Sequence, residues 1–363
     1  MLTDEGKKND KTIIVMNRLL KRITSLILTM AVVCMISCKK AGEPNNGGNN
    51  GGNDGETPEA PAIVSTSEVQ YDGEVFIEAV FENETKMYFE ILSPNEVALV
   101  NGEFYYQNNH SLAYMYRGEV VIPEAITHLG ATYSVVSIAK KAFYHNEMVT
   151  AVYIPNTVTA INSYYTDSYY PNERTLGVFQ DCSCLERIHM SDNIQIIEGN
   201  AFNGCLCYAD TVTILSHVKQ IGACAYDSRT VRFNADSCLV AGGSYGTPAN
   251  PTVATSFPQM NSISFGTNVK VLPSYIYSGG LFTGSFPHDV EIPASIQIIN
   301  EHALSTIFQI NSTVTCRAII PPVLGNDVFG QRVIEVIYVP MDSVEAYKTA
   351  DGWSEYADVI VGI

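Results

Sequence analysis

Short alternations of apolar and polar residues recur along most of the chain. The clearest copy covers residues 149–161, where a valine-rich alternation ends in Ile154-Pro155 and an apolar-x-x-Ile step follows. Alternation at period two predicts a short strand with one buried face. The proline ends that strand because it has no N–H to donate to a neighbouring strand. The pattern therefore predicts a series of short strands, each closed by a turn.

These copies recur at a nearly constant period. An Ala-Phe or similar pair follows the step, and Phe179 lies 23 residues before Phe202, just as Cys182 lies 23 before Cys205. One such unit cannot bury its own apolar face, but stacked units share a continuous interior. We predict a curved solenoid with a parallel sheet on one face, and the alternative is a globular antiparallel sandwich. The copies fall within residues 118–123, 133–146, 149–161, 178–190, 194–205, 211–226, 260–272, 289–304, 315–329 and 336–340.

At these residues the chain resembles the BspA-type leucine-rich repeat family of Bacteroidota surface proteins. In that family, copies of Leu-x-x-Val-x-Ile-Pro-x-x-Val-x-x-Ile-x-x-x-Ala-Phe-x-x-Cys stack as a right-handed solenoid. The resemblance covers about residues 118–358 and is most specific over 118–205. It implies a β-rich, right-handed leucine-rich-repeat solenoid with a parallel sheet. Insertions interrupt the period at residues 162–177, 234–259 and 277–288.

Two regions flank the predicted solenoid, which we place at residues 118–340. Residues 62–117 lack the repeat and consist of extended apolar segments. The first unit of a solenoid exposes an apolar end, so we expect these segments to form a β-rich N-terminal cap. Residues 341–363 are the expected C-terminal cap, with one short helix from Ala346 to Ala357. The stretch from Ala318 to Trp353 also resembles the closing segment of the family.

Residues 1–37 are typical of an export signal. The basic residues Arg18, Lys21 and Arg22 precede an apolar run of 14 residues that ends at Ile36. A membrane-spanning helix needs about 20 residues, so the run fits the apolar core of a signal peptide instead. Met16, which lies just before the basic residues, is an alternative start of the protein.

The apolar run ends in Ser37-Cys38, which resembles the bacterial lipobox, where the cysteine becomes the N-terminus and carries lipid. We therefore predict lipidation at Cys38, and the alternative is a secretory peptide with an incidental cysteine. Residues 38–61 are rich in Gly, Asn and Pro without a large apolar side chain, which predicts a flexible tether. We expect a lipid-anchored outer-membrane protein on the cell surface. The periplasmic face and secretion are the alternatives.

Charge narrows the set of partners. The 363 residues include 38 Asp and Glu against 21 Lys and Arg, a net charge of −17. Such a chain repels phosphate backbones, so we expect no nucleic-acid partner. Loss of residues 1–37, which carry six basic and three acidic residues, leaves a net charge of −20. The mature chain is therefore expected to contact the membrane through the lipid anchor only, and to be a monomer.

Nine cysteines raise the question of metal binding or disulfides. Seven remain once Cys34 and Cys38 are set aside, and Cys182-x-Cys184 and Cys205-x-Cys207 form two close pairs. Their one-residue spacing differs from the two to four residues typical of zinc knuckles. Because Cys182 and Cys205 share one repeat position, we predict a buried ladder of free thiols. Disulfides and a metal site are the less favoured alternatives.

No motif indicates catalysis. The seven histidines are scattered, and neither a nucleophile elbow nor a glycine-rich phosphate loop is present. Carboxylates are abundant, but no pair stands out as a hydrolase would require. We predict no enzyme activity, no catalytic residue, no metal and no cofactor.

One insertion is rich in tyrosine. Tyr164, Tyr165, Tyr169 and Tyr170 are candidate ligand contacts, because tyrosine offers a large contact area at low entropic cost. Alternatively, this segment folds back and covers an edge of the solenoid.

Two triplets, Asp210-Thr211-Val212 and Asp342-Ser343-Val344, match the Asp-Ser/Thr-apolar pattern of O-glycosylation in Bacteroidota. Thr211 and Ser343 are therefore candidate glycosylation sites.

Signal, tether and repeats together predict a lipid-anchored binding or adhesion protein at the cell surface. The resemblance implies a protein or glycan ligand, on a host or on another bacterium. The alternative is a structural or accessory lipoprotein of an outer-membrane complex without an external ligand. A secreted hydrolase is a third hypothesis, which requires a pocket with converging carboxylates or a Ser/His pair.

Overall fold

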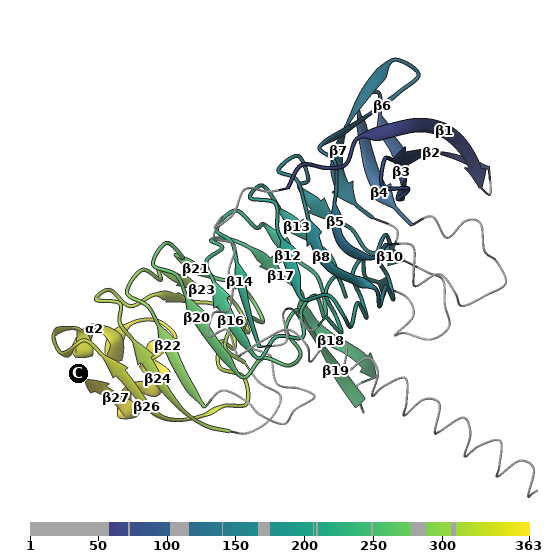
Figure 1. Ribbon diagram of the computed structural model, residues 1–363. Coiled ribbons are helices and arrows are strands. Elements are labelled where there is room, and N and C mark those ends of the chain that lie inside the picture. Colours follow the sequence, from purple (N-terminus) through teal and green to yellow (C-terminus); the bar gives the residue numbers. More distant parts are fainter. Residues whose placement is uncertain are drawn as a thin grey trace, which may run out of the picture. The chain divides into compact units, whose positions relative to one another are not determined.

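A computed structural model shows a chain built almost wholly from short strands (Figure 1). The described residues all fall within one compact unit, Gly48–Ile363. The predicted signal and the predicted lipidation site Cys38 lie outside them, and side chains are not described at residues 71, 164, 165, 175, 242–247 and 250–255. The structure describes residues 58–71, 73–101, 116–139, 141–165, 175–205, 207, 210–247, 250–276, 288–305 and 310–363.

The N-terminal segments form an antiparallel sheet. Its strands pair in chain order, and alternate residues such as Ile77 and Phe89 are fully buried. The extended segments predicted within 62–117 are these strands. The last of them pairs in parallel with a strand of the repeats, so the N-terminal sheet continues directly into the solenoid. The strands are β1 (Ile63–Tyr71), β2 (Glu74–Phe81), β3 (Lys86–Ser93) and β4 (Glu96–Val100), joined to β7 (Ala131–Ile138), which also pairs with β6 (Ala125–His128).

The predicted valine-rich alternations form the first strand of each coil. Strands β8, β22 and β26 end at or one residue before the Ile or Val that precedes a proline, as expected for a residue without an N–H. All these strands pair in parallel, which confirms the solenoid and shows that the antiparallel sandwich is wrong. They form three sheets: β5 (Gly118–Val121), β8 (Val149–Tyr153) and β12 (Arg187–His189); β14 (Thr211–Ile214), β16 (Thr230–Phe233) and β20 (Ser262–Phe265); β22 (Asp289–Ile292), β24 (Asn311–Cys316), β26 (Val333–Val339) and β27 (Ile360–Gly362).

A second side of the coil also carries parallel strands, whereas we predicted a sheet on one face only. The apolar-x-x-Ile step becomes a two-residue strand, because a turn such as Val158 N–H to Pro155 O redirects the chain and leaves room for one pair of rungs. The buried isoleucines of successive coils then lie in register. These strands are β9 (Ala160–Ile161), β13 (Ile196–Ile197), β15 (Gln220–Ile221) and β17 (Leu239–Val240), which continue from β7, and β21 (Val271–Leu272), β23 (Ile298–Ile299) and β25 (Val323–Leu324).

The two strand sides share one interior. Val152 of a first strand and Ile161 of the following second strand are both fully buried in the same apolar cluster, which extends from Ile77 to Ile360. Each buried Val, Leu, Ile or Phe side chain contributes roughly 1.5–3 kcal/mol. Because the cluster is continuous between coils, no coil provides it alone.

The C-terminal cap contains two short helices where we predicted one. An α-helix, α2 (Val344–Thr349), follows the 3-10 turn η4 (Met341–Ser343) and precedes the 3-10 helix η5 (Trp353–Val359). The extended backbone of Ala350, with φ −70° and ψ 146°, ends α2, and Gly352 precedes η5 with a φ of 76°. Trp353 is fully buried, and its indole N–H donates to the carbonyl of Pro322 at 2.8 Å. Within the described residues, none of the helices has the length and apolarity to cross a membrane.

Candidate functional site

In six successive coils, the third side, which follows the second strand, is organised by one buried aromatic ring. This ring follows the second strand, as the Ala-Phe pattern predicts, and each ring stacks on that of the next coil. Consecutive ring centroids are 4.7, 4.9, 5.3, 4.9 and 6.0 Å apart, a separation typical of stacked aromatic pairs. The ladder fixes the position of the residues that follow it in every coil. Its members are Tyr116, Phe143, Phe179, Phe202, Tyr226 and Phe257, all at most 2% exposed.

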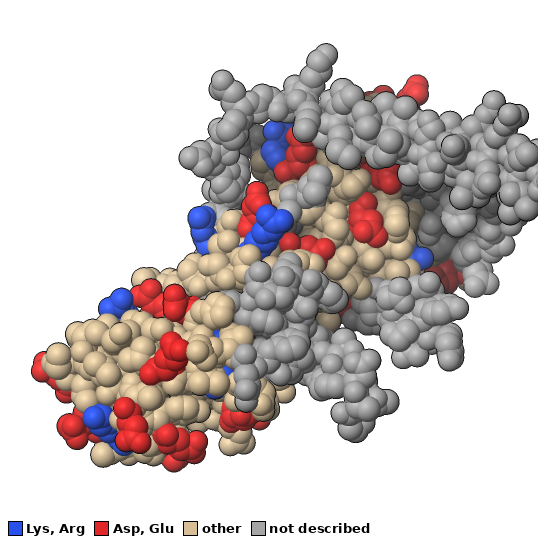
Figure 2. Space-filling view, turned by 90° about the horizontal axis from the view of Figure 1, so that it is seen from below, with Lys and Arg blue, Asp and Glu red and all other residues tan. Residues whose placement is uncertain are grey.

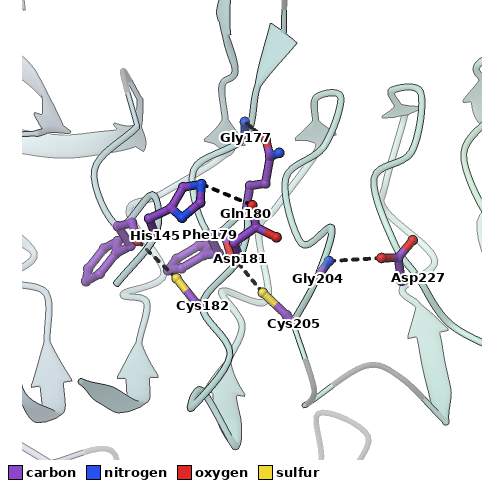
Figure 3. Close-up of polar contacts among 10 residues, drawn as sticks. His145, Gly177, Phe179, Gln180, Asp181, Cys182, Gly204, Cys205 and Asp227 are labelled. Carbon is purple, nitrogen blue, oxygen red and sulfur yellow. Dashed lines mark hydrogen bonds and ion pairs between the residues drawn. The ribbon is translucent and has the colours of Figure 1, made fainter. Parts of the chain in front are cut away.

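Buried thiols bind adjacent coils together beside these rings. The Cys182 thiol donates to the carbonyl of Phe143 at 3.0 Å, and the Cys205 thiol donates to that of Phe179 at 2.8 Å (Figure 3). Burial raises the pKa of the Cys205 thiol well above its usual range, so it stays protonated and weakly nucleophilic at neutral pH. The predicted ladder is confirmed, and all seven cysteines among the described residues are free.

The same repeat position carries a different polar side chain in other coils. In an earlier coil, buried Asn146 accepts the N–H of Val149 at 3.0 Å. In the last coil, buried Arg332 donates from Nε to the carbonyl of Leu304 at 2.5 Å. Because Arg332 lies three residues after Phe329, as Cys205 does after Phe202, its guanidinium takes the place of the thiol donor.

Polar side chains line the outer surface of the third side. His145 Nε2 lies 3.2 Å from Asp181 Oδ2, and the N–H of Gly204 donates to Asp227 Oδ2 at 2.9 Å (Figure 3). Burial raises the pKa of the Asp227 carboxyl, and the nearby charge of Asp181 adds to this, while the Gly204 N–H opposes it. The first contact joins residues two places after successive rings, and the second joins Gly204, two places after Phe202, to Asp227, one place after Tyr226.

Gly204 allows two carboxylates to approach one coil from either side. A Cβ at this position would lie 2.5 Å from Oδ1 of Asp181, and φ is +74°, so a side chain there is excluded. Among the described residues, no group of three or more His, Cys, Asp and Glu side chains is arranged to hold a metal ion. The arrangement is a hydrogen-bonded polar surface.

Two insertions leave the solenoid at equivalent positions. The hairpin of β10 (Tyr164–Tyr165) and β11 (Thr175–Leu176) directly follows β9, and the hairpin of β18 (Gly242–Thr247) and β19 (Asn250–Thr255) directly follows β17 (Figure 1). Strands β9 and β17 are three rungs apart in one ladder, about 14 Å at the usual strand spacing. Both hairpins therefore rise from the same corner of the coil, between the second strand and the aromatic ring.

The coils between the insertions hold the base of the first hairpin. The Ser163 N–H donates to Glu198 Oε2 at 2.6 Å, and the Ser163 hydroxyl donates to the carbonyl of Gly199. Gly177, at the end of this insertion, packs so closely that a Cβ would lie 1.8 Å from the carbonyl oxygen of Asn200.

The second hairpin is fixed in a similar way. The Ser256 hydroxyl accepts the N–H of Ala241 and donates to the carbonyl of Ile221, both at 3.1 Å. One residue at the end of the insertion thus joins its beginning to the preceding coil. The bases of both hairpins are held by side-chain bonds to coils that lie between them.

The predicted tyrosine site falls partly within this region. Tyr164 and Tyr165 form β10 and lie opposite Leu176 and Thr175, while Tyr169 and Tyr170 lie outside the described residues. Their role in ligand binding stays a prediction.

The two predicted glycosylation sites differ in environment. Thr211 is half-buried at the start of β14, whereas Ser343 is buried and its hydroxyl donates to the carbonyl of Ile319 at 2.7 Å. A sugar on Ser343 requires that this bond be broken. Modification at either residue stays a prediction.

The outer face of the first-strand sheets was not singled out from the sequence. Glu119 and Arg187 lie in one row on either side of Ala151, and their side chains meet at 2.8 Å above it, which leaves Ala151 fully buried. In the next row the rings of Tyr153 and His189 stack at 4.2 Å. Period-two alternation marks these residues as outward, but only the strand register shows that they touch.

Burial and two neighbouring charges set the protonation state of His189 on this face. Partial burial lowers the pKa of His189, the Arg187 charge lowers it further, and Glu119 opposes both. The imidazole is therefore neutral at pH 7 and offers a ring face and a hydrogen-bonding nitrogen.

Comparison with known proteins identifies the repeats. Residues 124–232 match the family described as BspA type leucine rich repeat region, in six copies. A leucine-rich repeat protein from Bacteroides ovatus is 18% identical, with 77% of this chain and 70% of that chain covered and a TM-score of 0.35. A leucine rich cell surface protein from Faecalibacterium prausnitzii is 15% identical, with 77% and 81% covered and a TM-score of 0.32. No curated protein matches this chain.

The matched residues begin just before β6 and end within β16, so they include the four middle rings of the aromatic ladder, the thiols of Cys182 and Cys205, and the first hairpin. The chain therefore contains a BspA-type leucine-rich repeat region, and its described repeats form a leucine-rich-repeat solenoid.

Proposed function

We propose that this chain is a non-catalytic binding protein of the bacterial cell surface, anchored by lipid at Cys38. Its ligand is a protein or glycan presented by a host or by another bacterium. The observation that carries the proposal is the pair of hairpins that leave equivalent corners of the solenoid about 14 Å apart. Insertions in repeat proteins often gather on one side, and that side is frequently the binding face.

The bases of the hairpins support this interpretation. Hydrogen bonds from Ser163 and Ser256 hold the hairpin bases to the coils in between. Part of the conformational entropy that ligand binding would otherwise cost is therefore already lost in the free protein. At this corner of a coil between the hairpins, Gly222 and Ala223 are small and half-buried. A ligand can thus approach the backbone closely.

The anchor and tether explain how such a surface is displayed. Residues 38–61 number 24, and a flexible Gly-rich chain of this length has a root-mean-square span of about 27 Å. That reach holds the folded body away from the membrane, and the acidic chain itself has little attraction to anionic lipid.

The proposal is tested with hairpin-replacement variants. Between Ile197 and Phe202 the chain needs only four residues, Glu-Gly-Asn-Ala, so this sequence can replace residues 162–178. Likewise Gly-Ala-Cys-Ala, from residues 222–225, can replace residues 241–256. We expect the intact chain to bind members of a glycan array or a matrix-protein panel, and the replaced chains to lose that binding while they still melt cooperatively.

Two results would contradict this scheme. Binding that survives replacement of both hairpins shows that the ligand contacts another surface. If the intact chain binds no member of either panel, the result argues against a binding protein with an external ligand.

A second candidate function is that of an accessory lipoprotein in an outer-membrane complex. The exposure of Ile319, Ile320 and Val323, at 73%, 80% and 67%, favours it, because adjacent exposed aliphatic residues suit a protein partner. Co-purification from detergent-solubilised membranes tests this function. Removal of the protein by protease added to intact cells supports surface display instead.

A further inference from the structure

We infer that the outer face of the β14–β16–β20 sheet binds a carboxylate-bearing glycan, with Arg232 as its anchor. This site lies on the first-strand side of the coil, away from the corner that carries the hairpins, and goes beyond the function proposed above. It rests on a difference in ion pairing among the three first-strand sheets: an arginine at each of the other two has a glutamate partner, and Arg232 has none among the described residues.

Hydroxyl side chains cover this sheet. Its strands pair in parallel and in register, so residues in one row are about 4.8 Å apart. The outward positions contain no carboxylate, and all but one carry a hydroxyl. One row is Thr211, Thr230 and Ser262, and the other is Thr213, Arg232 and Ser264.

The arginine in the middle strand is exposed and has no carboxylate partner among the residues that the structure describes. Its neighbours in the row are Thr213 and Ser264, each with a short hydroxyl side chain. Arg229 is also exposed and lies just before β16, so two positive charges occur within four residues of a chain with a net charge of −17.

At each of the other two first-strand sheets, one exposed arginine is paired with a glutamate of the protein. Arg187 pairs with Glu119 at 2.8 Å, and Arg317 pairs with Glu291 at 3.1 Å. In each case a glutamate on a nearby strand supplies the anion. At Arg232 the sheet offers no glutamate, so the anion must come from outside.

The surrounding chemistry selects the ligand class. A guanidinium binds a carboxylate through two parallel hydrogen bonds, which is stronger and more directional than a neutral contact. Serine and threonine hydroxyls both donate and accept, which matches the hydroxyls of a sugar ring. A sugar ring presents several hydroxyls close together, whereas a peptide backbone presents one N–H and one C=O per residue, so we assign the site to a glycan that contains uronic or sialic acid.

The test measures binding of the full-length chain in detergent to polygalacturonate, hyaluronan and polysialic acid. Methyl-esterified polygalacturonate serves as the neutral counterpart. We expect at least one acidic glycan to bind and its ester to bind at least 10-fold more weakly. Arg232→Ala should weaken binding about 10-fold, the effect of one charge-assisted contact at an exposed site.

Two matched variants separate this site from general charge effects. Arg187→Ala removes an equally positive residue from the same side of the solenoid and should change affinity less than 2-fold, since Arg187 is already paired. Ser264→Glu places a carboxylate on the strand next to Arg232 and should abolish binding, whereas Ser264→Gln should retain it.

Several results would overturn the inference: no acidic glycan binds, the ester binds equally well, or Arg232→Ala has no effect. Equal binding of poly-glutamate would assign the site to acidic peptides instead. Because the hairpins are intact in all these variants, ligand binding that ignores Arg232 leaves the proposed function standing while this site fails.

Discussion

The inner and the outer positions of the coils follow opposite rules. Inside, Phe143, Phe179 and Phe202 repeat the same ring in three coils and stack within 5.3 Å. Outside, equivalent strand positions hold an ion pair in one sheet and hydroxyls with a lone arginine in the next. Each coil depends on its neighbours for stability, so the interior must match, whereas outward side chains are free to differ. Function is therefore expected where coils differ.

Charge shows the same contrast along the chain. Residues 288–363 hold ten Asp and Glu against three Lys and Arg, and Figure 2 shows acidic side chains gathered at the end of the molecule that carries the C-terminus. The outward positions of β14, β16 and β20 contain no acidic residue. An acidic ligand therefore meets no like charge at the outward positions of this sheet.

The largest effect is expected inside. Phe202→Ala removes a fully buried ring that stacks on Phe179 and Tyr226, and large-to-small core changes of this kind cost about 3–5 kcal/mol. Urea unfolding measures the loss. Tyr153→Ala, on the outer face, is the matched control and should cost less than about 1 kcal/mol. Equal costs would show that inner and outer rings do not differ in this way.

A smaller effect is expected for the thiol ladder. Cys205→Val keeps the site apolar, with a slightly larger side chain, but removes the donor to Phe179, which should cost about 1 kcal/mol because that carbonyl still accepts the Cys182 N–H at 3.1 Å. Cys205→Ser restores a donor and should be less costly in the same urea assay. A valine variant as stable as the wild type would mean that the thiol acts only as an apolar filler.

The outer ion pair should contribute less still. Glu119→Gln breaks the contact with Arg187, and both side chains are more than half exposed, so the expected loss is about 0.5 kcal/mol. The loss should shrink in 1 M salt, where the Debye length is about 3 Å. Thermal melts at two salt concentrations check this, and a loss that is independent of salt would indicate packing over Ala151 as the cause.

The smallest effect depends on pH. The pKa of Asp227 is raised in the fold, so the folded state favours the neutral carboxyl, and its contribution to stability is lost as pH rises through that raised pKa. Asp227→Asn keeps an acceptor for the Gly204 N–H without the charge. Relative to the wild type it should gain less than about 1 kcal/mol at pH 7, because the group is partly exposed, and nothing at pH 3.

Urea unfolding of both proteins at the two pH values measures this difference. A gain that persists at pH 3 would show that the Asp227 charge is not its source.

The sequence alone determined the repeat and its interior. Period-two alternation marked the first strands, the prolines marked their ends, and the spacing of Phe179, Phe202, Cys182 and Cys205 placed rings and thiols in the same position of successive coils. These features depend only on local pattern and on the need of short units to share a core.

Only the tertiary structure decided what depends on register. Two-residue strands such as Ile196–Ile197 are too short to be recognised from a pattern, and they pair because the turn before them, closed by the Ile194 N–H and the Ser191 carbonyl, brings them into line with the coil before. The meeting of Glu119 with Arg187, 68 residues apart, and the absence of such a partner among the described residues around Arg232 follow from which coils are adjacent. Contacts between coils join residues that are distant in the chain, and a local pattern carries no information about them.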